Sequence, residues 1–225
     1  MQVGNKSYRT VADVPEQVPV FPLSGALLLP GAQLPLNIFE PRYLAMFDDA
    51  LVSDRVIGII QPALENGGNS PGPVKDLCSV GCLGRITSLG ETGDGRYVIT
   101  LGGICRFRVL EELSQDGRPY RVCAIAPFGS DLDAADDGAD VDRKALLDSF
   151  RAYLDANNLE ADWSSVERAS TVSLVNSLSM MSPYGPAEKQ ALLEAGDTKT
   201  RAETLVAITE IALARDGDDY DRVLQ

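Results

Sequence analysis

The side chains best suited to chemistry in this chain are its four cysteines, because the sequence contains no histidine. Without an imidazole, the catalytic triads, general bases and metal sites that are built on histidine are excluded. The cysteines are Cys78, Cys82, Cys105 and Cys123. The first two are four residues apart, which is not the spacing of zinc ribbons or redox pairs. We therefore expect buried thiols, with a four-thiolate metal site or disulfides as alternatives, and we predict no metal and no cofactor.

A serine–lysine dyad is the remaining route to hydrolysis, since the chain has five lysines. Two of them, Lys189 and Lys199, lie in patterns typical of exposed helices. Adjacent acidic pairs such as Asp48–Asp49 and Glu111–Glu112 diverge in direction from a helix or strand, so they do not face one substrate. No glycine loop of the phosphate-binding type occurs either. We predict a protein that is not an enzyme.

The acidic side chains are concentrated in the second half of the chain. Residues 1–127 carry 11 basic and 13 acidic side chains, whereas residues 128–225 carry 9 and 20. A negative surface repels phosphate backbones, so nucleic-acid binding is disfavoured. A local basic patch remains in the first half, and we expect its arginines to lie on solvated strand faces and in ion pairs. The alternative that stays open is RNA binding by a face made of Arg85, Arg96, Arg106, Arg108, Arg118 and Arg121.

The amino-terminal residues MQVGNKSYRT are polar, and no apolar core of a signal peptide follows them. The longest apolar runs fall far short of the ~18–20 residues that a membrane span needs. We therefore expect a cytoplasmic protein with no membrane segment.

The elements that must position these groups begin with an apolar stretch from residue 19 to residue 51, which five prolines interrupt. Proline suits edge strands, turns and the first turn of a helix. The pattern predicts short strands and then a helix that opens at Glu40–Pro41. Further strands are expected at residues 55–61, 77–89, 96–110 and 120–127, with a hairpin at Asp94–Gly95. Glycines within these strands, namely Gly81, Gly84, Gly102 and Gly103, indicate bulges or close backbone approach.

The second half reads as helices that could form a small bundle. We predict one helix from Ser164 or Ser165 to Met181, a short helix closed by Gly196, and a last helix capped by Asp197 that ends at Gly217. The predicted organisation is a polar lead-in (1–17), a strand-rich subdomain (18–127), an acidic linker (128–142), a helical bundle (143–215) and an acidic tail (216–225).

Two blocks of the sequence resemble the N-terminal, substrate-binding domain of Lon proteases. The first is FPLSGALLLPGAQLPLNIFEPRYLAMFDDAL, and the second is SLSMMSPYGPAEKQALLEAGDTKTRAETL. In the second block the family's short helix reads K-Q-x-L-L-E, here residues 189–194, and Asp197 and Arg201 follow. The resemblance spans about residues 18–215. It implies an α+β fold: a PUA-like small β-barrel with one helix after the opening strands, followed by a C-terminal helical bundle.

The resemblance also implies a stand-alone bacterial member without ATPase and protease domains, which binds unfolded or degron-bearing polypeptides without ATP. Its role would be chaperone-like or that of an adaptor for a partner protease; the sequence predicts no oligomeric state. Such binding needs exposed apolar surface, and methionine adapts to varied partners. The candidates are Phe21, Leu23, Phe39, Tyr43 and Phe47 near the barrel–helix junction, and Met180, Met181 and Tyr184 near the helical break. The alternatives are that these side chains are core, or that a PUA-like barrel binds RNA or a small ligand.

Overall fold

The computed structural model describes residues 1–63, 74, 76–114, 116–133 and 138–223, without the side chains of residues 216–223. The chain forms two compact units. The first contains Met1–Ala135 and Pro183–Leu193, and the second contains Asp136–Ser182 and Glu194–Gln225. The segment Pro183–Leu193 thus belongs to the first unit, contrary to its expected place among the helices of the second half.

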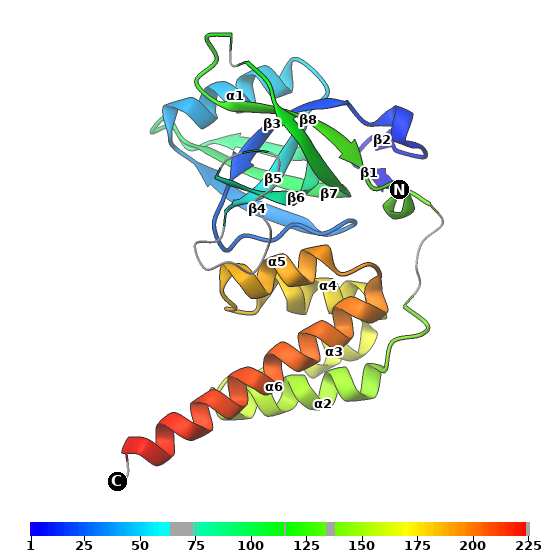
Figure 1. Cartoon of the computed structure of the whole chain (residues 1–225), viewed down its shortest axis with the longest axis vertical. Helices are drawn as coiled ribbons and strands as arrows, with labels where there is room; N and C mark the ends of the chain where they lie inside the picture. Colours follow the sequence, from blue (N-terminus) through cyan, green and yellow to red (C-terminus); the bar gives the residue numbers. More distant parts are fainter. Residues whose placement is uncertain (64–73, 75, 115, 134–137, 224–225) are drawn as a thin grey trace. The chain divides into compact units, whose positions relative to one another are not determined.

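A six-stranded sheet forms the body of the first unit (Figure 1). Its strands are β3 (Gln17–Pro22), β4 (Gln33–Ile38), β5 (Val56–Pro62), β6 (Leu77–Glu91), β7 (Tyr97–Glu112) and β8 (Arg121–Pro127). The order is β4-β7-β6-β5-β3-β8, and β7 also pairs with β8. Only the β3–β5 pair is parallel among the described ladders. The strands predicted from the alternating and apolar patterns are all confirmed.

Helix α1 (Pro41–Leu51) follows β4 and begins as predicted, with Glu40 as N-cap and proline in the first turn. Proline is favourable there because the first helical N–H has no partner within the helix. Its apolar face buries Tyr43, Met46, Phe47 and Ala50. This face contacts β3.

The amino terminus is part of the core rather than a separate lead-in. Strands β1 (Gln2–Val3) and β2 (Lys6–Ser7) form a hairpin, and a 3-10 turn, η1 (Val11–Asp13), follows. Val3, Tyr8 and Val14 are buried in the apolar cluster of the sheet, with Tyr8 wholly inaccessible. The prediction of a polar lead-in was based on composition, and the polar residues around these three side chains gave no sign of their burial.

Glycines in the long strands allow close backbone approach, as the sequence indicated. A Cβ at Gly103 would fall on the carbonyl oxygen of Leu29, and a Cβ at Gly81 would lie 2.6 Å from the carbonyl oxygen of Ile59. The β6–β7 ladder also shifts register near Gly84. These positions need glycine because any side chain would collide with backbone.

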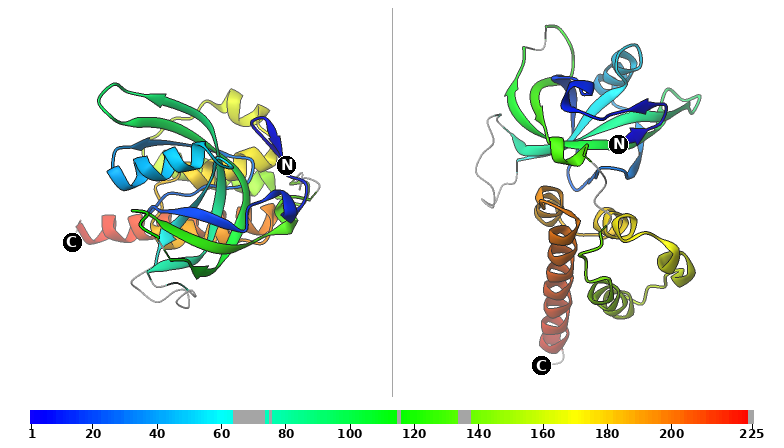
Figure 2. Two further views of the ribbon diagram at one scale, coloured as in Figure 1. Left: turned by 90° about the horizontal axis from the view of Figure 1, so that it is seen from above. Right: turned by 90° about the vertical axis from the view of Figure 1, so that its right-hand side faces the viewer.

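Helices α2 (Arg143–Ala156), α3 (Trp163–Arg168), α4 (Thr171–Met181) and α6 (Thr198–Val223) make up the second unit, where α6 contacts α2 and α4. The single helix predicted to end at Met181 was wrong: Asp162 caps α3 and Ser170 caps a separate α4. The predicted cap Asp197 is confirmed by its hydrogen bond from the Thr200 amide. The predicted end at Gly217 was wrong, since α6 is one continuous helix to Val223 (orange to red in Figure 2).

The acidic linker expected at residues 128–142 is only partly a linker. Its first residues form a 3-10 turn, η2 (Gly129–Asp131), and Leu132 is buried in the core of the first unit. Residues 134–137 lie outside the described part of the chain. Among the described residues, every helix is too short or too polar to span a membrane.

Candidate functional site

A pocket of about 460 Å³ opens where α1 begins beside the sheet of the first unit. We call it the α1 pocket. It is lined by Val20, Pro22, Arg42, Tyr43, Pro62, Pro119, Tyr120 and Arg121. Three prolines and two tyrosines therefore form its faces, and two arginines supply its charge. None of the eight lining side chains is a nucleophile or base with a pKa near neutrality.

An aromatic cluster supports one wall of the α1 pocket. The ring of Phe21 packs against Tyr43, with centroids 4.2 Å apart, and meets Phe47 edge-on at 6.4 Å. Burial raises the pKa of the Tyr43 hydroxyl, so the phenol stays neutral. The Arg42 guanidinium lies over the Tyr43 ring at 4.6 Å and forms an ion pair with Glu40 at 2.7 Å. Arg42 remains half-exposed and can reach a ligand.

The opposite wall is fixed by two acidic residues outside the pocket. The Tyr120 hydroxyl donates a hydrogen bond to the Asp49 carboxylate on α1. Burial and this bond raise the pKa of Tyr120 to about 12. Arg121 binds Glu112 through two hydrogen bonds, of 2.8 Å and 2.6 Å, and the bond to Glu112 raises the pKa of Arg121. The pocket thus combines neutral aromatic faces with two guanidinium groups, each paired with a carboxylate.

The predicted binding residues are divided by the structure into core and surface. Phe21, Tyr43 and Phe47 are buried together, whereas Phe39 is 62% exposed beyond the end of β4. The remaining candidates of the first unit, Leu23 and Tyr184, are partly buried. In the second unit Met180 is partly buried and Met181 is 82% exposed at the end of α4.

Helix α5 (Pro186–Glu194) carries the K-Q-x-L-L-E residues and is fastened to the sheet by two glutamines. The Gln61 side chain donates to the carbonyl of Pro186 at 2.8 Å and to the Gln190 side-chain oxygen at 3.1 Å. Gln190, wholly buried, donates in turn to the carbonyl of Val80 at 3.1 Å. Lys189 on the same helix is buried, contrary to the exposed position expected from the sequence, and burial lowers its pKa. The sequence offered one signal for this arrangement, a glutamine at the end of an apolar strand.

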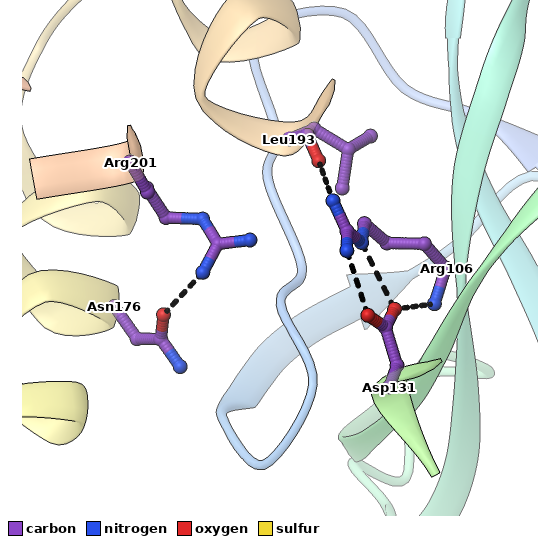
Figure 3. Close-up of polar contacts among 5 residues, drawn as sticks. All are labelled: Arg106, Asp131, Asn176, Leu193 and Arg201. Carbon is purple, nitrogen blue, oxygen red and sulfur yellow. Dashed lines mark hydrogen bonds and ion pairs between the residues drawn. The ribbon is translucent and has the colours of Figure 1, made fainter. Parts of the chain in front are cut away.

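Arg106 forms a buried ion pair whose partner and burial the sequence did not reveal (Figure 3). Its guanidinium donates to both carboxylate oxygens of Asp131, at 2.9 Å and 2.7 Å, and to the carbonyl of Leu193 at 3.3 Å. Within the second unit, Arg201 donates to the side-chain oxygen of Asn176 at 3.5 Å. Both arginines are buried, and both contacts hold segments that are distant in sequence.

The arginines considered for RNA binding do not form one open basic face. Arg85 is buried and donates to the Asp54 carbonyl at 2.8 Å and to Asn5 at 3.0 Å. Besides Arg106 and Arg121, Arg96 pairs with Asp94 at 3.3 Å. Four of the six guanidinium groups are therefore engaged by groups of the chain itself, which reduces their attraction for phosphate.

The four cysteines are buried, as predicted. Burial raises the pKa of Cys105 to about 12 and that of Cys123 to about 11, so these thiols stay protonated near neutral pH. In the part of the chain that the structure describes, no group of three or more histidine, cysteine, aspartate or glutamate side chains could hold a metal ion.

Comparison with known proteins relates most of the chain to Lon proteases. Residues 17–210 match the family described as the ATP-dependent protease La (LON) substrate-binding domain. Lon protease 2 of Sorangium cellulosum is 28% identical over 221 residues, which cover 92% of this chain and 26% of that protein. Lon protease 2 of Myxococcus xanthus is 34% identical over 109 residues, which cover 48% of this chain and 13% of that protein. The chain thus spans about a quarter or less of these relatives.

Two solved structures share the fold. The crystal structure of a Lon N-terminal domain protein from Xanthomonas campestris has a TM-score of 0.58 and 22% identity, covering 85% of this chain and 97% of that one. The N-terminal domain of the Mycobacterium avium complex Lon protease has a TM-score of 0.61 and 18% identity, covering 86% and 98%. Because the family match covers most of its length and these folds agree, the chain belongs to the LON substrate-binding domain family.

Proposed function

We propose that this protein binds unfolded or degron-bearing polypeptides, without ATP and without catalysing a reaction, as a chaperone-like factor or an adaptor for a protease in the cytoplasm. The observation that carries the proposal is the match of residues 17–210 to a domain named for substrate binding in Lon. The pairing of β7 with both β6 and β8 supports a PUA-like barrel as the scaffold of the first unit, and the contacts of α6 with α2 and α4 support a helical bundle as the second.

The α1 pocket is the proposed place of binding. Proline and tyrosine faces can cover an apolar side chain of an unfolded segment. Native proteins bury most such side chains, so this contact favours unfolded chains. Arg42 can donate hydrogen bonds to main-chain carbonyls or carboxylates at the rim. The buried Phe21 and Phe47 hold the wall in place, and the exposed Phe39 at the start of α1 adds apolar surface. Met181 offers a further apolar contact on the second unit.

Fluorescence anisotropy tests this function directly. The probe is labelled α-lactalbumin that has been reduced and carboxymethylated, with native α-lactalbumin and a labelled RNA as comparisons. We expect saturable binding of the unfolded probe and weak binding of the other two. Equal binding of unfolded and native α-lactalbumin would contradict the function, and a salt-sensitive preference for RNA would replace it with nucleic-acid binding.

A matched pair of arginine variants tests the α1 pocket. Arg42 and Arg96 are both exposed, and each pairs with an acidic residue two positions earlier, Glu40 or Asp94. Only Arg42 lines the pocket. We expect Arg42→Ala to weaken binding of the unfolded probe about five- to tenfold and Arg96→Ala to change it less than about twofold. Equal effects of the two would mean that charge alone, and not the pocket, attracts the polypeptide.

A further inference from the structure

Strand β4 has one edge without a partner strand in the part of the chain that the structure describes. It lies at the end of the sheet order and pairs with β7 alone, from Gln33 opposite Gly102 to Ile38 opposite Tyr97. An edge of this kind presents main-chain N–H and C=O groups that can pair with another extended chain.

The direction in which these groups point follows from one hydrogen bond and one proline. The Gly103 amide donates to the Ala32 carbonyl at 2.8 Å, so Ala32 faces β7. The N–H and C=O groups of successive residues point alternately to the two sides of a strand. Those of residues 34, 36 and 38 therefore also point toward β7, and those of residues 33, 35 and 37 point away from it. Pro35 fits this phase, since proline has no N–H to give to β7 and is confined to positions that face outward.

The side chains beside this edge are suited to a passing polypeptide. Gln33, Pro35 and Asn37 are all exposed. Phe39 continues the same alternation and is 62% exposed, and Val98, opposite Asn37 on β7, is 45% exposed. Polar groups therefore border the strand, and two apolar side chains stand near its carboxyl end.

We propose that the outer edge of β4 binds an extended polypeptide segment by strand addition. The segment accepts hydrogen bonds from the amides of Gln33 and Asn37 and donates to the carbonyls of residues 33, 35 and 37. An apolar side chain of the segment rests on Phe39. Main-chain pairing gives affinity without reading a sequence, which suits a binder of many unfolded chains. The proposal rests on the polypeptide binding proposed above and adds the binding mode.

The same proline favours a foreign segment over a second copy of this chain. Pairing of two β4 edges would bring two Pro35 residues together, so the joint ladder would lack two donors. A segment without proline leaves only one donor missing. Proline on an edge strand weakens pairing with any further strand, and it acts twice when both strands carry it. The occupant is therefore an extended segment of another polypeptide.

Two variants of Asn37 test the main-chain contact. Asn37→Pro removes the outward amide, and Asn37→Ala removes the same side chain but keeps that amide. The pairing with β7 is untouched in both, so the thermal unfolding midpoint should stay within a few degrees of wild type. For reduced, carboxymethylated α-lactalbumin we expect Asn37→Pro to raise the dissociation constant about tenfold and Asn37→Ala to raise it less than twofold. Equal affinity of Asn37→Pro and wild type would overturn the strand addition while leaving polypeptide binding intact.

Amide hydrogen exchange on the wild-type chain is a second test of the strand addition, and it does not depend on the folding of a variant. Addition of the unfolded probe should slow exchange of the amides of Gln33 and Asn37 several-fold, with no change at the hairpin around Asp94. Protection that instead grows with the concentration of the chain alone would assign the edge to a second copy and overturn the proposal. No binding of the probe by wild type would overturn both this proposal and the polypeptide-binding function.

Discussion

Arg106 on β7 and Asp131 in η2 form a buried, two-point ion pair, with nitrogen–oxygen distances of 2.9 Å and 2.7 Å. The Arg106 amide also donates to the same carboxylate at 2.8 Å, and its guanidinium donates to the Leu193 carbonyl at 3.3 Å. Asp131 lies just before one place where the chain leaves the first unit, and Leu193 lies at another. One arginine therefore fixes two exits of the chain from this unit.

Loss of the carboxylate should destabilise the first unit strongly. Asp131→Asn leaves the Arg106 guanidinium buried without its counter-charge, so we expect the free energy of unfolding to fall by about 3–5 kcal/mol. The control is Glu112→Gln, which breaks the more exposed pair with Arg121 and should cost about 1 kcal/mol or less. Urea unfolding followed by circular dichroism measures both. The single tryptophan, Trp163, lies in the second unit, so its fluorescence does not report this loss.

The two glutamines that fasten α5 should be energetically coupled. Gln61→Leu and Gln190→Leu each leave buried polar groups without a partner, which costs about 1–3 kcal/mol. The double variant removes both partners of their shared bond, so its loss should be smaller than the sum of the single losses. A double-mutant cycle by urea unfolding measures the coupling. Strict additivity would show that the 3.1 Å contact contributes nothing.

Much of the first unit could be predicted from local signals. Pro41 marked the start of α1, the Asp94–Gly95 turn marked the β6–β7 hairpin, and Asp197 capped α6. Each of these signals acts within a few residues, so the sequence carries it in full. Tyr8 shows the limit, because nothing near it in sequence reveals that it fills the core of the sheet.

The candidate site was less predictable because periodicity shows which residues share a face but not whether that face is open. Phe21, Tyr43 and Phe47 follow an apolar pattern, and the structure uses them to support a wall. The partner of Arg106 was also hidden, since Asp131 lies 25 positions away in a segment whose composition resembles a solvated linker. Long-range pairing of this kind leaves no local trace.

Close backbone approach at Gly103 should make that position intolerant of any side chain. Gly103→Ala places a Cβ on the Leu29 carbonyl oxygen, so the backbone must shift and we expect a loss of about 1–3 kcal/mol or more, seen by urea unfolding and soluble yield. Gly90→Ala is the control in β6, because its Cβ would meet nothing nearer than 4.0 Å. The control should be neutral or slightly stabilising. Comparable losses in both would refute the steric explanation.

Burial of the thiols predicts that alkylation depends on unfolding and on pH. The pKa of Cys105 is raised to about 12 and that of Cys123 to about 11, so at pH 8 the folded chain has almost no thiolate at either site. The unfolded chain releases these protons near pH 9. Because the folded pKa values are the higher ones, stability is full below pH 9 and falls as the pH rises toward 11 and 12.

Mass spectrometry after iodoacetamide treatment at pH 8 should therefore find negligible modification of the folded chain and complete modification in urea. Rapid labelling of Cys105 without denaturant would show that this part of the core opens, and Cys105→Ala should make the loss of stability above pH 9 less steep.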